Sequence, residues 1–123
     1  MANIIPFAFR GELFSGTHNF ANGGNSFKIA LYTGNPYSTS STTYLTGQEV
    51  SASNTGYTTG GKVLASQAVA SGTAVASVDF ADSALTSATF TAAFAAIYND
   101  TNSDKLCVVL DFGGNKTATN GTF

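Results

Sequence analysis

The sequence AFAAIYNDTNSDKLCVVLDFGG, residues 93–114, contains two apolar runs that are separated by a polar segment. Side chains alternate between the two faces of a strand, and both faces of residues 93–98 and of residues 106–110 are apolar. The Asn, Asp and Ser residues between the runs favour a tight turn. The stretch therefore predicts a β-hairpin that is covered on both faces and around which the rest of the chain is arranged.

The second arm of this hairpin is the most apolar run in the chain, so we expect it inside a sheet and not at an edge. A regular alternation predicts one shared face for four of its side chains: Leu106, Val108, Leu110 and Phe112. Gly113 and Gly114 are expected to end the arm, and a polar turn follows them.

Further strands are predicted where apolar and polar residues alternate between turn residues. Residues 27–33 are one such strand, residues 62–69 and 74–80 form a second hairpin, and residues 88–92 precede the central hairpin. About seven strands at this spacing indicate an all-β fold, an antiparallel β-sandwich or a jelly-roll-like barrel. A single domain is expected over 1–123, with an N-terminal arm in 1–20 and the β-sandwich in 26–123.

The N-terminal arm is predicted to contain a short helix within residues 4–15. Pro6 suits the first helical turn, and Gly16 suits the end of the helix. Three phenylalanines lie in this segment: Phe7, Phe9 and Phe14. Two interpretations stay open, a helix that plugs one end of the β-fold and an arm that docks on a neighbouring subunit.

The composition excludes several classes of function. Charged residues make up 10% of the 123 residues and the net charge is −2, so a nucleic-acid partner is not expected. No apolar run is long enough to cross a membrane as a helix, and residues 1–9 lack the features of a signal peptide. The low charge favours association, so we expect a subunit of an assembly.

No catalytic, cofactor-binding or metal-binding residues are predicted, and the protein is not expected to be an enzyme. Cys107 is the single cysteine and lies in an apolar strand, which favours a buried structural role. The single histidine, His18, is far away in sequence and is not expected to act as its base. Residues 100–104 begin like a calcium loop, but Lys105 stands where such a loop needs glycine, so we expect a turn.

Four tyrosines are considered as a possible sugar-binding surface: Tyr32, Tyr37, Tyr44 and Tyr57. Tyrosine combines an apolar ring with a polar tip, which suits carbohydrate binding but equally suits packing and contact between subunits. Both interpretations stay open on the sequence.

Several segments together resemble a family of small virion structural proteins of tailed bacteriophages. The resemblance covers nearly the whole chain and lies in residues 13–20, 27–33, 56–62, 78–82, 96–100 and 109–114. It implies a structural protein without chemistry of its own. It also implies that residues 120–123 begin a final strand.

Among such proteins, a small β-rich chain with low charge resembles a head-decoration, or cement, protein. The resemblance then implies a homotrimer on the capsid exterior, bound to the major capsid protein. The residues expected to contact a partner are Phe7, Phe9, Phe14, Tyr37 and Tyr44. The alternative is a tail or fibre module that binds a host-surface glycan through exposed tyrosines.

Overall fold

The computed structural model describes residues 3–53 and 55–123. In these ranges the chain is mostly β, with one short helix, as the sequence predicts. The elements are α1 (Phe7–Phe14), β1 (Phe27–Tyr32), β2 (Lys62–Val63), β3 (Ala68–Ser71), β4 (Ala76–Asp79), β5 (Ala88–Asn99) and β6 (Lys105–Gly121).

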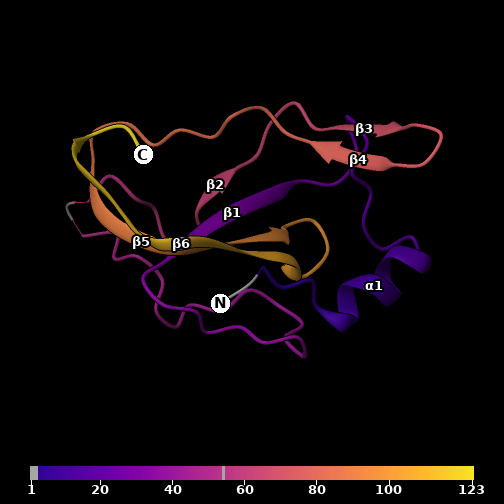
Figure 1. Ribbon diagram of the computed structural model, residues 1–123, viewed down its shortest axis with the longest axis horizontal. Helices are drawn as coiled ribbons and strands as arrows, with labels where there is room; N and C mark the ends of the chain where they lie inside the picture. The colour runs from indigo at the N-terminus through magenta and orange to yellow at the C-terminus, as the bar shows by residue number, and fades with distance from the viewer. Residues whose placement is uncertain (1–2, 54) are drawn as a thin grey trace.

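The described strands form two antiparallel sheets. One sheet has four strands in the order β2-β1-β5-β6, and the other is the β3–β4 hairpin (Figure 1). The four-stranded sheet is open, so the predicted barrel is wrong. There are six described strands instead of about seven, because residues 88–92 and 93–98 form the single strand β5.

The central hairpin is confirmed as the pair β5–β6. Asn99 closes its turn, since its Oδ1 accepts hydrogen bonds from the backbone N–H groups of Thr101 and Asn102 at 3.1 and 3.2 Å. β1, the other predicted strand of regular alternation, pairs with β5 along its whole length from Phe27↔Asn99 to Tyr32↔Phe94. The hairpin and β1 therefore form the middle of the fold.

The predicted shared face of the second arm is wrong at Leu106. The register changes from Ile97↔Val108 to Tyr98↔Leu106, which leaves Cys107 as an extra residue. Such a bulge places two consecutive side chains on one face and reverses the alternation beyond it. As a result Leu106 packs with Tyr98 on one face of the sheet, and Cys107 packs on the other.

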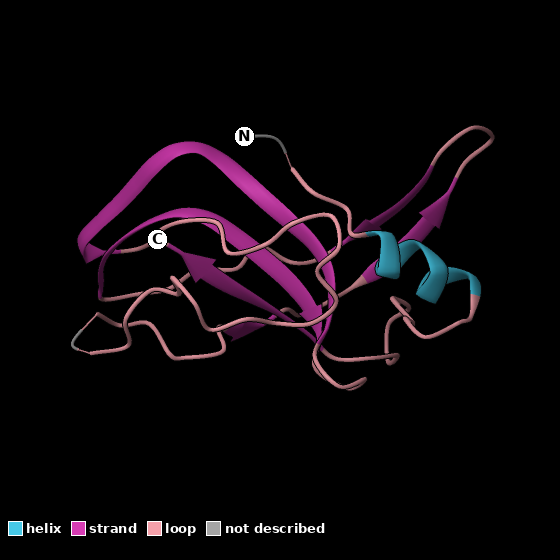
Figure 2. Ribbon diagram, turned by 90° about the horizontal axis from the view of Figure 1, so that it is seen from below, coloured by secondary structure: helices cyan, strands magenta, loops and turns pink. Residues whose placement is uncertain are grey.

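β6 does not end at the two glycines, as the sequence predicts, but continues to Gly121. Gly113 and Gly114 have φ angles of 78° and 151°, which only glycine adopts without strain. The register changes there from Ala92↔Lys116 to Phe94↔Asp111, so the glycines lie in a second irregularity. The ribbon bends strongly instead of ending (Figure 2).

The predicted interior position of the second arm is also wrong, since β6 is the last strand of its sheet. Two other segments pair with its outer edge. Ile4 and Val109 exchange two backbone hydrogen bonds of 2.9 Å, and Leu106 N–H donates to Thr42 O at 2.9 Å. The apolar strand is thus protected at its edge by irregular segments, which a strand pattern does not reveal.

The predicted strand at residues 62–69 is split into two. Lys62–Val63 pairs with β1 as β2, while Ala68–Ser71 pairs with β4. Gly61 allows the close approach to β1, because a Cβ there would lie 2.0 Å from Ile29 O. The predicted hairpin turn is confirmed, and every residue of β3 and β4 is exposed.

Both faces of the four-stranded sheet are covered, as the sequence predicts. One face packs against the loop that contains Tyr37 and Tyr44, and the other packs in part against Phe9 and Phe80. Near the end of the chain, Phe123 exchanges two backbone hydrogen bonds with Leu85, at 2.9 and 3.1 Å. The chain up to Gly121 is strand, so the predicted polar turn is wrong.

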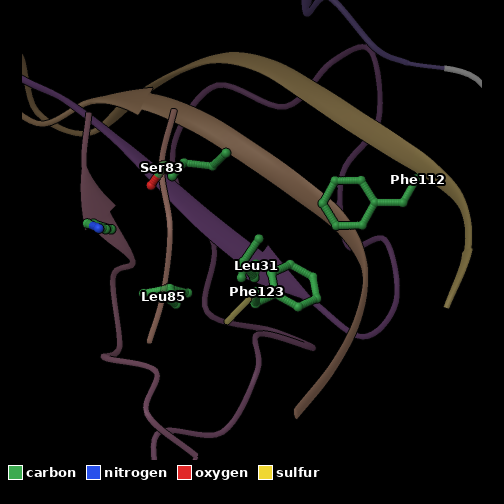
Figure 3. Close-up of a pocket in the computed structure, with 7 residues that line it drawn as sticks. Leu31, Ser83, Leu85, Phe112 and Phe123 are labelled. Atoms are coloured by element: carbon green, nitrogen blue, oxygen red, sulfur yellow. The ribbon is translucent and has the colours of Figure 1, made fainter. Parts of the chain in front are cut away.

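Phe123 fixes the described end of the chain onto the core. Its ring centroid lies 4.7 Å from that of Phe90 and 6.3 Å from that of Phe112. A pocket of about 210 Å³ remains beside it, lined in part by Leu31 and Leu85 (Figure 3).

Candidate functional site

α1 carries the phenylalanines that the sequence marks as contact residues. Pro6 stands at its N-cap with φ −61°, and Gly16 lies beyond its last turn with φ 74°. Thr17 N–H donates to Glu12 O at 2.9 Å and Gly16 N–H donates to Leu13 O at 3.2 Å, which is the Schellman arrangement. The helix is shorter than the predicted 4–15, because Ile4 pairs with β6 and Ser15 is its C-cap.

The three phenylalanines lie on different sides of α1. Phe9 faces inward, and its ring centroid lies 5.0 Å from His18 and 6.1 Å from Phe20. Phe7 and Phe14 are 60% and 94% exposed. Phe7, Arg10 and Phe14 follow the spacing i, i+3, i+7 and share one side of the helix, which we call the outer face of α1.

An apolar groove lies on the other side of α1, between the helix, the β3–β4 hairpin and the sheet. We call it the α1 groove, and its volume is about 530 Å³. Its lining residues are Ile5, Phe9, Leu13, Phe20, Val78, Phe80, Ile97, Cys107 and Val108. All nine are apolar or weakly polar. The two views place α1 below and beside this hairpin (Figures 1 and 2).

A buried polar cluster lies at the side of the α1 groove, although its members are distant in sequence. His18 Nε2 lies 2.9 Å from Glu12 Oε1, and His18 Nδ1 lies 3.8 Å from Cys107 Sγ. Lys105 Nζ lies 3.4 Å from the other carboxylate oxygen of Glu12. Glu12 therefore ties α1 to the body of the protein by two contacts.

The hydrogen bonds of Asn99 decide which nitrogen of His18 carries a proton. Asn99 Oδ1 already accepts from Thr101 and Asn102, so its Nδ2 is the group that donates to His18 Nδ1 at 3.0 Å. His18 Nδ1 is thus an acceptor, and Nε2–H donates to Glu12. The lone pair that a thiol would need is engaged by Asn99.

Cys107 therefore has a nearby imidazole but no free base. Its exposed fraction is 2%, and burial, with a smaller effect of Glu12, raises the pKa of Cys107 to about 12. A thiol with this pKa is protonated at neutral pH and is a weak nucleophile. The sequence argument from separation was incomplete, since the fold brings His18 to Cys107, while the buried role of Cys107 agrees with the sequence.

The tyrosines of the predicted sugar-binding surface point into the protein. Tyr32, Tyr37 and Tyr57 are at most 5% exposed, and Tyr44 stacks on Tyr98 with ring centroids 4.6 Å apart. The expectation of exposed tyrosines is therefore wrong, and the glycan alternative loses the residues on which it rests. The contact role predicted for Tyr37 and Tyr44 stays a prediction.

Glu49 explains why these tyrosines turn inward. Its carboxylate accepts hydrogen bonds from Tyr44 Oη at 2.5 Å, Tyr57 Oη at 2.6 Å and Gly60 N at 2.9 Å. Burial and the bond to Glu49 raise the pKa of Tyr57 above its ordinary value. Tyr32 and Tyr37 share a hydrogen bond of 2.5 Å between their hydroxyl groups. These groups form an internal network that holds the loops on the sheet.

The segment that resembles a calcium loop is the turn of the central hairpin. Asp100 Oδ1 lies 3.8 Å from Lys28 Nζ, and Asn102 Nδ2 donates to Thr17 O. Among residues 3–53 and 55–123 there is no group of three or more His, Cys, Asp or Glu side chains that could hold a metal ion.

Comparison with known proteins returns no relative: no family model matches the chain, and neither a curated protein nor a solved structure is similar to it. In the described part of the chain, no helix is long and apolar enough to cross a membrane. Arguments about function therefore rest on the chain's own residues.

Proposed function

We propose that this chain is a structural subunit of a tailed-phage virion, without enzymatic activity, and that it decorates the capsid exterior. The observation that carries the proposal is the outer face of α1. A ring that is 94% exposed, as Phe14 is, and a second that is 60% exposed are costly to leave in water on a chain with so few charges. Covering them by a neighbouring subunit removes that cost.

The proposed partners are the major capsid protein and further copies of this chain, as a homotrimer, and no cofactor takes part. A subunit that binds the assembled shell and not its dissociated parts stabilises the shell by mass action. The polar interior supports a passive role, since no buried side-chain nitrogen or oxygen of the described residues lacks a hydrogen-bond partner.

The finer fold class that we propose is a β-sandwich. Support comes from the pairing of Leu85 with Phe123, which packs against Phe90 and Phe112 beside the four-stranded sheet. The β3–β4 hairpin, through Phe80, lies over another part of the same sheet.

The proposal is tested by co-sedimentation of the purified protein with capsids of the phage that encodes it, emptied of decoration protein. We expect saturable binding and a higher melting temperature of the shell. Capsids that bind no protein at saturating concentration would contradict the proposed role.

A further inference from the structure

α1 presents apolar side chains on two opposite sides. Phe9 and Leu13 line the α1 groove, whereas Phe7 and Phe14 point to solvent on the outer face. A straight helix cannot turn its outer face into the groove that its own inner face borders. The outer face and the groove of one copy are therefore both left unfilled by that copy.

We propose that the outer face of α1 in one copy docks into the α1 groove of the next copy, with Phe14 as the anchor. This inference rests on the proposed function as an assembling subunit and names its self-contact. The groove, at about 530 Å³, is within the range of pockets that bury a ligand. Exposed aromatic rings that enter such pockets carry most of the affinity of an interface.

The charges near the two surfaces favour a second copy as the occupant. Arg10 lies between Phe7 and Phe14 and forms no ion pair among the described residues; its guanidinium lies 5.4 Å over the Phe7 ring. Asp79 and Asp82, which follow Val78 on the segment that walls the groove, likewise form no ion pair there. A cationic outer face thus meets a groove with acidic residues at its rim.

The contact joins two different surfaces, so it is heterologous. A heterologous contact produces a closed ring when its rotation closes, and a ring of three copies gives the proposed homotrimer. Each copy then gives one outer face and accepts one, which leaves no aromatic anchor of this kind exposed.

Two variants separate the two halves of the contact. Phe14→Ser removes the anchor and leaves the groove intact, while Val78→Arg blocks the groove and leaves the anchor. Both positions are exposed, at 94% and 43%, so the fold should tolerate them. Val75→Arg is the matched control, because Val75 is 70% exposed on the same hairpin but does not line the groove.

The masses are measured by sedimentation velocity and light scattering. We expect a trimer for the wild type and for Val75→Arg, and monomers for Phe14→Ser and for Val78→Arg, with association weakened roughly 30-fold or more. An equimolar mixture of the two monomeric variants should form a one-to-one dimer and stop there. One copy supplies the anchor, the other supplies the groove, and the remaining two surfaces are disabled.

Other outcomes overturn the inference. A monomeric or dimeric wild type excludes the ring, and a mixture that stays monomeric shows that the two surfaces do not meet. If circular dichroism shows that either variant is unfolded, Arg10→Glu replaces it, and a trimer of that variant would contradict the charge argument. Capsid binding by a monomer would overturn this contact and leave the proposed function standing, whereas a trimer that binds no capsid would do the reverse.

Discussion

At the scale of single residues, Asn99 determines the chemistry of the one histidine. It is fully buried, it closes the central turn with its Oδ1 and it donates to His18 Nδ1 with its Nδ2. His18 consequently donates to Glu12, which holds α1 against β6. A group that looks like a catalytic thiol, imidazole and carboxylate is by this geometry a structural clasp.

The protonated state of Cys107 gives a prediction about alkaline stability. The thiol has a folded-state pKa of about 12 against an ordinary value of 9.0, so above pH 9 only the unfolded chain loses this proton. Stability from this source is complete below pH 9 and falls as the pH rises, by up to about 1.4 kcal/mol for each pH unit. Urea titrations at pH 8 and pH 10 measure the fall.

The control for that prediction is Cys107→Ala, which removes the titrating group. The variant should lose less stability than the wild type over the same interval. Tyrosines with raised pKa values, such as Tyr57, add to the fall mainly above pH 10 in both proteins. Equal losses in the two proteins would mean that the thiol is not held protonated.

The sequence reveals the burial of Cys107 and not its neighbours. An apolar strand around a cysteine is a local signal, and the structure agrees with it. The approach of His18 depends on a chain separation of 89 residues and on how α1 docks beside β6. No spacing rule encodes such a contact, so the cluster could only be found in the fold.

At the scale of elements, the two sides of α1 should respond differently to truncation. Phe9→Ala removes packing against His18 and Phe20 and should lower the free energy of unfolding by about 2 kcal/mol. Phe7→Ala and Phe14→Ala should each change it by less than about 0.5 kcal/mol, measured below the concentration at which the protein associates. Urea unfolding followed by far-UV circular dichroism checks all three.

The same comparison bears on the choice of contact residues. From the sequence, Phe7, Phe9 and Phe14 are equivalent, because all three lie in one predicted helix. The structure separates them by the 100° between successive helical positions. A large loss of stability in Phe14→Ala with none in Phe9→Ala would reverse the assignment of the inner and outer faces.

β6 shows where pattern reading succeeds and where it fails. Alternation and turn residues predict the hairpin and the strand at residues 27–33, because those signals are local. The bulge at Cys107 and the bend at Gly113 and Gly114 change register without interrupting the strand. Glycines that end a strand and glycines that bend one are alike in sequence, so the strand continues past a predicted end.

At the scale of the whole molecule, the protein combines a fully satisfied polar interior with aromatic rings left at its surface. Glu49 and five tyrosines account for much of that interior, and they turn inward the residues that a sugar site would expose. The exposed apolar groups gather at α1 and the β3–β4 hairpin. A molecule of this kind is built to be covered by other subunits.

The central claim is that this chain is a shell subunit of the virion. The measurement that tests it most directly is the copy number of the protein in purified virions, by quantitative mass spectrometry against the major capsid protein. We predict a number of copies close to stoichiometric with the capsid subunit. A handful of copies per virion would place the protein in the tail, and its absence from the virion would contradict the account altogether.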